Sequence, residues 1–98
     1  MIRHVVMFKF KPEVDTKTRF EFVQRLRKLV DDVEVVRTLE IGQNFTQTPR
    51  SSDLVLMVDL DDEDALAAYA DHPMHQPVKK MLSEICSETR VVDYVLPD

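Results

Sequence analysis

Glycine is nearly absent from this chain, since Gly42 is the only glycine among its 98 residues. Phosphate-binding loops, dinucleotide fingerprints and the sharp turn that carries a nucleophilic serine depend on glycines, because their backbones bend tightly or approach a ligand closely. None of these sites can be built here, so the classes of enzyme that rely on them are excluded. Gly42 itself ends a predicted strand, where it indicates a positive φ or a close backbone approach.

Cysteine is equally scarce, with Cys86 alone. One cysteine cannot form a disulfide within the chain or build a thiolate metal site, and Cys86 follows an apolar helical pattern that places it in the core. The histidines are the other candidate metal ligands, because His72 and His75 lie three residues apart and His4 could join them. The pattern is not H-E-x-x-H, however, and Pro73 disturbs the helix between them, so we expect no metal.

The chain also lacks a basic stripe and any long apolar run. Its formal net charge is −5, and the basic Arg25, Arg27 and Lys28 are followed directly by acidic residues, so we expect no nucleic acid partner. No apolar run approaches the ~20 residues of a membrane-spanning helix, so we expect no membrane contact. The N-terminus runs straight into a charged strand rather than a signal peptide, and we expect a cytoplasmic protein.

Apolar residues recur with period two in four segments and with helical spacing in three. The strand pattern covers residues 2–11, 35–42, 54–60 and 89–95, and the helical pattern covers residues 16–30, 62–71 and 77–87. This order predicts an α+β, ferredoxin-like split βαβ fold: a four-stranded antiparallel sheet with helices on one face, formed as one domain over residues 1–98.

The expected ends and faces of the helices follow from the same pattern. Asp15 is the expected N-cap of the first helix, and His72, which precedes Pro73, is the expected hinge after the second. The first helix should turn its apolar side toward the sheet, with Phe20, Val23, Leu26, Leu29 and Val30.

The face of the sheet opposite the helices is unusually apolar. Alternation along the strands places there Val5, Met7, Val55, Met57, Val92 and Tyr94. A monomer would expose these side chains as one patch, whereas two such sheets packed face to face would bury it. We therefore expect a homodimer that forms through the open face of the sheet.

The stretch Y-A-D-H-P-M-H-Q-P, residues 69–77, holds most of the side chains that could do chemistry near neutral pH. His4 lies on the helix-facing side of the first strand, and Asp93 could orient His75 and raise its basicity. Tyr69 could donate its phenolic hydrogen to a carbonyl or enolate. Each feature also has a plainer interpretation. His4 could be a buried core histidine, and H-P-M-H could be a helix break with capping side chains. Asp93 could bond only to the backbone, and Tyr69 could be a core residue.

Four segments carry a resemblance: the opening I-R-H-V-V-M-F-K-F-K, the I-G-Q-N at the end of the second strand, residues 54–75 with H-P-M-H, and the closing V-V-D-Y. Through them the chain resembles the stress-responsive dimeric A/B barrel (Dabb) family over essentially its whole length. The resemblance implies a ferredoxin-like protomer that pairs into a dimeric α+β barrel. A related plant polyketide cyclase type implies acid/base roles for His4 and His75, a supporting role for Tyr69, and orientation of His75 by Asp93.

Two functions stay open. One is the binding of a small hydrophobic or aromatic metabolite between sheet and helices, in a pocket that we expect Val6, Phe8, Phe22 and Val58 to line. The other is cofactor-independent aldol condensation by a cyclase-like lyase. The segment after His75 departs from the cyclase type, because Lys79 stands where a small residue would shape the pocket. The sequence leaves the identity of the ligand or substrate open, and no cofactor is implied.

Overall fold

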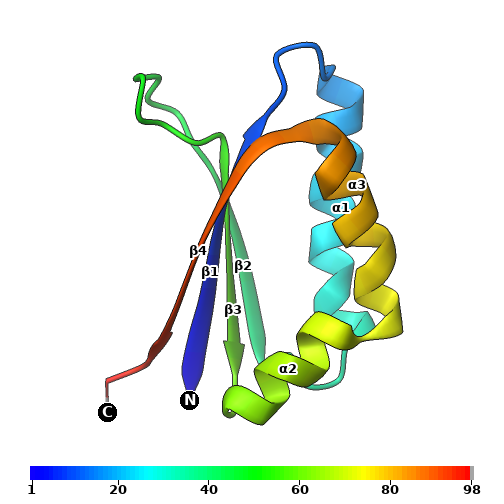
Figure 1. The fold of residues 1–98 in the computed structure, drawn as a ribbon, viewed down its shortest axis with the longest axis vertical. Coiled ribbons are helices and arrows are strands. Elements are labelled where there is room, and N and C mark those ends of the chain that lie inside the picture. The colour runs from blue at the N-terminus through cyan, green and yellow to red at the C-terminus, as the bar shows by residue number, and fades with distance from the viewer. Residues whose placement is uncertain (98) are drawn as a thin grey trace.

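The computed structural model describes residues 1–97 and confirms the predicted α+β architecture (Figure 1). Its elements are β1 (Ile2–Phe10), α1 (Thr16–Asp32), β2 (Thr38–Gln43), β3 (Leu54–Leu60), α2 (Glu63–Asp71), a 3-10 helix (Pro73–His75), α3 (Gln76–Ile85) and β4 (Cys86–Val95). The strands form one antiparallel sheet in the order β2-β3-β1-β4. Figure 1 shows the helices on one side of this sheet, with α1 and α3 running beside each other.

Two predicted strand limits were wrong. The second strand begins at Thr38 rather than residue 35, because the chain first makes a turn in which the Val36 amide donates to the Val33 carbonyl. The last strand begins at Cys86 rather than residue 89, because α3 ends at Ile85 and the chain extends at once. No loop separates these two elements, so β4 pairs with β1 along nearly its whole length.

Helix α1 begins as predicted, and its buried face agrees with the predicted one in part, at Val23, Leu26 and Leu29. The Asp15 carboxylate accepts a hydrogen bond from the Thr18 amide at 2.8 Å, which satisfies one of the free N–H groups of the first turn. The prediction that Phe20 and Val30 face the sheet was wrong, since 62% of Phe20 and 40% of Val30 are exposed. The buried stripe instead follows helical spacing through Phe22, Val23, Leu26 and Leu29 to the C-cap Val33.

The core lies between the helices and the predicted inner face of the sheet. Alternate residues of the two central strands are almost fully buried: Ile2, Val6, Phe8 and Phe10 on β1, and Leu54, Leu56, Val58 and Leu60 on β3. Phe22 packs edge-on against Phe8, with ring centroids 5.3 Å apart. The helices cover the edge strand β4 less completely. Val95 points to the helix-facing side, yet 72% of it is exposed.

Gly42 is required for close packing rather than for an unusual backbone. Its φ is not positive. It lies opposite Val55 in the β2–β3 ladder, and a Cβ at this position would meet Cγ1 of Val55 at 3.1 Å, tighter than ordinary contact. Of the two predicted reasons for this glycine, close approach is therefore the one that holds.

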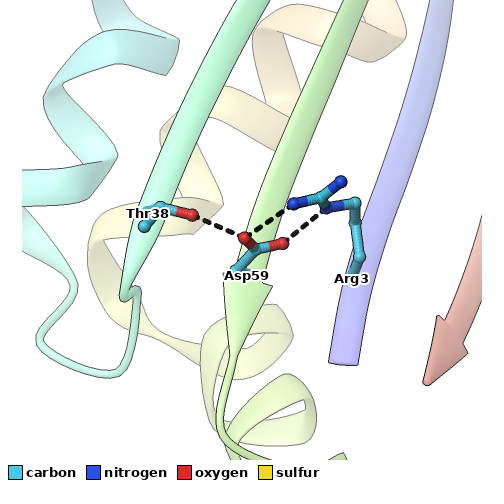
Figure 2. Close-up of polar contacts among 3 residues, drawn as sticks. All are labelled: Arg3, Thr38 and Asp59. Carbon is cyan, nitrogen blue, oxygen red and sulfur yellow. Dashed lines mark hydrogen bonds and ion pairs between the residues drawn. The ribbon is translucent and has the colours of Figure 1, made fainter. Parts of the chain in front are cut away.

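The open face of the sheet combines apolar side chains with polar ones, including a polar cluster around Asp59. Met7, Val92 and Tyr94 are exposed there, as predicted. Figure 2 shows the polar cluster, in which the Arg3 guanidinium donates two hydrogen bonds to the Asp59 carboxylate, at 2.7 and 3.0 Å, and Thr38 donates a third at 2.8 Å. These contacts join β1, β3 and β2, and the hydrogen bonds from Arg3 are the main reason that the pKa of the buried Asp59 carboxyl is lowered.

Candidate functional site

The break between α2 and α3 positions the chemistry-bearing residues. Helix α2 ends at Asp71, and His72 adopts an extended backbone (φ −60°, ψ 135°) because the following Pro73 disfavours the helical region. The chain then makes the short 3-10 helix and enters α3 at Gln76. This break places Tyr69, in the last turn of α2, next to His75, with ring centroids 4.4 Å apart.

A cavity of about 60 Å³ lies between this break and the sheet. Its wall is mostly apolar and its lining residues are His4, Val6, Phe8, Leu26, Leu56, Tyr69, His75, Val78, Lys79 and Leu82. The fold therefore brings together three of the four predicted site residues from β1, α2 and the 3-10 helix. The His4 ring also packs edge-on against Tyr69, at a centroid distance of 5.8 Å.

Two polar atoms at this site are buried without a hydrogen-bond partner among residues 1–97: the Tyr69 hydroxyl and Nδ1 of His75. A buried polar group that lacks a partner costs about 1–3 kcal/mol of stability, and native folds contain few of them. Two such groups on adjacent rings beside one cavity indicate a site adapted to something other than stability.

Burial keeps both groups neutral. It is the main reason that the pKa of His75 is lowered to about 4, and the positive charges of Lys79, His4 and His72 lower it further. Burial likewise raises the pKa of the Tyr69 hydroxyl. At neutral pH the site therefore presents an uncharged imidazole beside an uncharged phenol, which together can accept and donate hydrogen bonds.

The fourth predicted residue, Asp93, has a different partner from the one expected. Its carboxylate lies 2.5 Å from Nδ1 of His4, so the prediction that it orients His75 was wrong. The physical reason is the register of the sheet, which places His4 and Asp93 directly opposite each other on β1 and β4. Because Asp93 binds Nδ1, the neutral His4 ring carries its proton there and keeps Nε2 as the basic nitrogen.

His72 has a structural role outside the cavity. Its Nδ1 accepts a hydrogen bond from the Met74 amide at 3.1 Å, which caps the 3-10 helix, and its Nε2 lies 3.3 Å from a Glu34 carboxylate oxygen. The capping interpretation of H-P-M-H therefore holds for this histidine. Among residues 1–97, no group of three or more histidine, cysteine or acidic side chains is arranged to hold a metal ion.

The predicted pocket residues divide into two groups. Val6 and Phe8 line the cavity, whereas Phe22 and Val58 are fully buried in the core and do not reach it. The predicted lining left out Val78 and Leu82 of α3, and Lys79, which was already expected at the pocket, lines it as well. Their spacing from His75, at i+3, i+4 and i+7, places all of them on the same helix face and was the signal in the sequence.

No helix in the described part of the chain is both long and apolar enough to cross a membrane.

Comparison with known proteins places the whole chain in one family. The model of the Stress responsive A/B Barrel Domain (Dabb) matches residues 2–96. An uncharacterised protein of Streptomyces coelicolor is 36% identical over 78 residues, 78% of this chain and 80% of that protein. A dimeric ferredoxin-like protein of unknown function from Jannaschia sp. CCS1 is 27% identical with a TM-score of 0.81, covering 97% of this chain and 98% of that one. The hydroxynitrile lyase of Passiflora edulis is 12% identical with a TM-score of 0.90, covering 99% and 94%.

Proposed function

Because this chain belongs to the stress-responsive A/B barrel (Dabb) family, we propose that it acts as a homodimer whose protomers each bind a small, largely apolar molecule between sheet and helices. The observation that carries this proposal is the pair of buried, unpartnered polar groups, the Tyr69 hydroxyl and Nδ1 of His75, beside one cavity. A ligand that hydrogen-bonds to both would remove a cost that the fold otherwise bears.

The residues that line the cavity indicate the chemical class of the ligand. The apolar part of a ligand can pack against Val6, Phe8, Leu26 and Leu56. Tyr69 donates a hydrogen bond, and His75 donates or accepts one according to its tautomer, so a carbonyl or hydroxyl oxygen is the matching polar group. The volume of about 60 Å³ corresponds to roughly two water molecules at liquid density. A larger ligand must therefore place its polar end inside and extend toward the opening.

Binding is tested by nuclear magnetic resonance titration with small ketones, alcohols and aromatic acids. We expect backbone amide shifts around residues 69–82 on the natural chain and affinity weakened on the order of tenfold in Tyr69→Phe and His75→Gln, since each loses one ligand hydrogen bond. Tyr94→Phe is the matched control, because Tyr94 lies on the open face of the sheet. Equal affinity of the natural chain and both cavity variants would refute the proposal.

The homodimer is supported by two observations. Exposed Met7, Val92 and Tyr94 lie on the side of the sheet that no helix covers, and packing two such faces together removes them from water. The Jannaschia relative, which covers nearly the whole chain, is described as dimeric.

A second function, cofactor-independent lyase or cyclase chemistry, is favoured by one separate observation. The contact between Nδ1 of His4 and the Asp93 carboxylate is the arrangement that orients a histidine base. The structurally similar Passiflora protein is named a hydroxynitrile lyase, so this fold supports lyase chemistry in at least one protein, although 12% identity carries only the fold.

In this second function, Nε2 of His4 removes a proton from a methylene next to a carbonyl, and the Tyr69 hydroxyl hydrogen-bonds the resulting enolate oxygen. The enolate carbon attacks a second carbonyl of the same molecule, and the proton held by His4 passes to the new alkoxide. The product is an aldol isomer of the substrate, so no oxidant or cofactor is consumed.

Turnover of a linear β-polyketone separates the two functions. The lyase function predicts that His4→Gln and Asp93→Asn lower the rate by at least tenfold while leaving binding largely intact. Binding without turnover in the natural chain would leave the binding function alone. A reaction that persists undiminished in His4→Gln would exclude the histidine mechanism.

A further inference from the structure

Among residues 1–97, Lys79 is the one lysine or arginine that lines the cavity. The residue is exposed yet forms part of the lining, so its side chain lies where the cavity meets solvent. It follows His75 by four positions on α3, and side chains on a helix lean toward its N-terminus. Its ammonium accordingly reaches back to the end of α2, where it donates a hydrogen bond to the Ala70 carbonyl at 2.5 Å.

The charge of Lys79 has no carboxylate to compensate it. Within residues 1–97, no acidic oxygen lies within 4.0 Å of its ammonium, and its hydrogen-bond acceptor is a neutral carbonyl. An ammonium group has three N–H donors, so the contact with Ala70 fixes its position and leaves two donors for a ligand.

The surroundings of the cavity favour a negative charge. The groups whose charge acts on His75 are Lys79, His4 and His72, and each of them is a cation when charged. Two carboxylates lie nearby, Asp93 on His4 and Glu34 on His72, but neither of them lines the cavity or lies within 4.0 Å of the Lys79 ammonium.

We infer that Lys79 makes the cavity selective for ligands whose polar end is a carboxylate: its ammonium binds the carboxylate from the opening, Tyr69 and His75 bind it from within the cavity, and the apolar body of the ligand lies against the apolar wall. This inference rests on the proposed binding function and specifies the class of ligand. Lys79 is then a specificity-determining residue.

The test compares acids with their amides, which have nearly the same shape but no charge. Butyrate and benzoate are titrated against butyramide and benzamide at pH 7.5, by nuclear magnetic resonance, on the natural chain and on three variants. Lys79→Met keeps the apolar stem and removes the charge. Lys79→Arg restores the charge, and Lys80→Met is the matched control because the exposed Lys80 does not line the cavity.

We expect the natural chain to prefer each acid over its amide on the order of tenfold, because charge-assisted hydrogen bonds are the stronger kind. The preference should disappear in Lys79→Met, return in Lys79→Arg and persist in Lys80→Met, and it should weaken with added salt. The affinity for the amides should fall far less in Lys79→Met than the affinity for the acids, because an amide loses only a neutral hydrogen bond.

The experiment distinguishes a failure of the role of Lys79 from a failure of the proposed binding function. Equal binding of acids and amides by the natural chain, with affinity still lowered in Tyr69→Phe, overturns the role of Lys79 and leaves the proposed function standing. A preference for acids that survives in Lys79→Met also overturns it. If none of the four compounds binds the natural chain, both the role of Lys79 and the proposed function are overturned.

Discussion

Removing the hydroxyl of Tyr69 should stabilise the protein. Tyr69 is only 1% exposed, and its hydroxyl has no hydrogen-bond partner among residues 1–97, so folding takes this group out of water without compensation. The cost of such a group is about 1–3 kcal/mol. Tyr69→Phe removes that cost and preserves the ring that packs against His75 and His4.

The expected gain is about 1 kcal/mol, at the low end of that range, because the cavity has room for water that could bind the hydroxyl and because the substitution leaves a small void. For a domain of this size, 1 kcal/mol corresponds to a rise in Tm of roughly 4–8 °C. The same variant should bind ligand more weakly, so stability and binding change in opposite directions, as expected of a functional group.

Urea unfolding at one fixed protein concentration measures the effect, because the stability of a dimer depends on concentration. A loss of more than about 1 kcal/mol in Tyr69→Phe would refute the reasoning, because it would show that the hydroxyl makes a stabilising hydrogen bond.

Three further predictions concern pH, assembly and helix capping. The pKa of His75 is lowered from 6.5 to about 4, so between these pH values the unfolded chain binds a proton that the folded chain does not. The free energy of unfolding should therefore fall as pH falls from 6.5 toward 4. In urea titrations at several pH values, His75→Gln should flatten this slope. Met57→Asp should place a charge in the proposed interface and give monomers by sedimentation velocity, whereas an intact dimer would exclude this face. Asp15→Ala should lower the free energy of unfolding by about 1 kcal/mol through loss of the helix cap, and no loss would mean that the cap contributes nothing.

Local patterns predicted much of the fold. Period-two alternation placed His4 on the helix-facing side of β1 and the apolar patch on the opposite face, because strand geometry sends successive side chains to opposite sides. The cap at Asp15 and the extended backbone at His72 follow from the chemistry of one or two neighbouring residues. Such features need no knowledge of distant parts of the chain.

The features that the sequence did not predict depend on long-range geometry. The pairing of His4 with Asp93 is set by the register between the first and last strands, which lie 89 positions apart at this point. The rotation of α1 about its axis, which buries Phe22 and exposes Phe20, depends on packing against the whole sheet. The sequence did contain the spacing that places Lys79 on the cavity side of α3, but only the structure shows that a cavity lies there.

Tyr69 and His75 are held neutral beside a cavity, without hydrogen-bond partners among residues 1–97 for the Tyr69 hydroxyl and Nδ1 of His75, and we propose that they bind a ligand there. A ¹⁵N nuclear magnetic resonance titration of the His75 imidazole, with and without benzoate, can test this proposal. We expect an imidazole that stays unprotonated as pH falls toward about 4 and an Nδ1 resonance that moves when benzoate is added. A His75 that titrates near 6.5 and whose Nδ1 resonance does not respond to benzoate would contradict it.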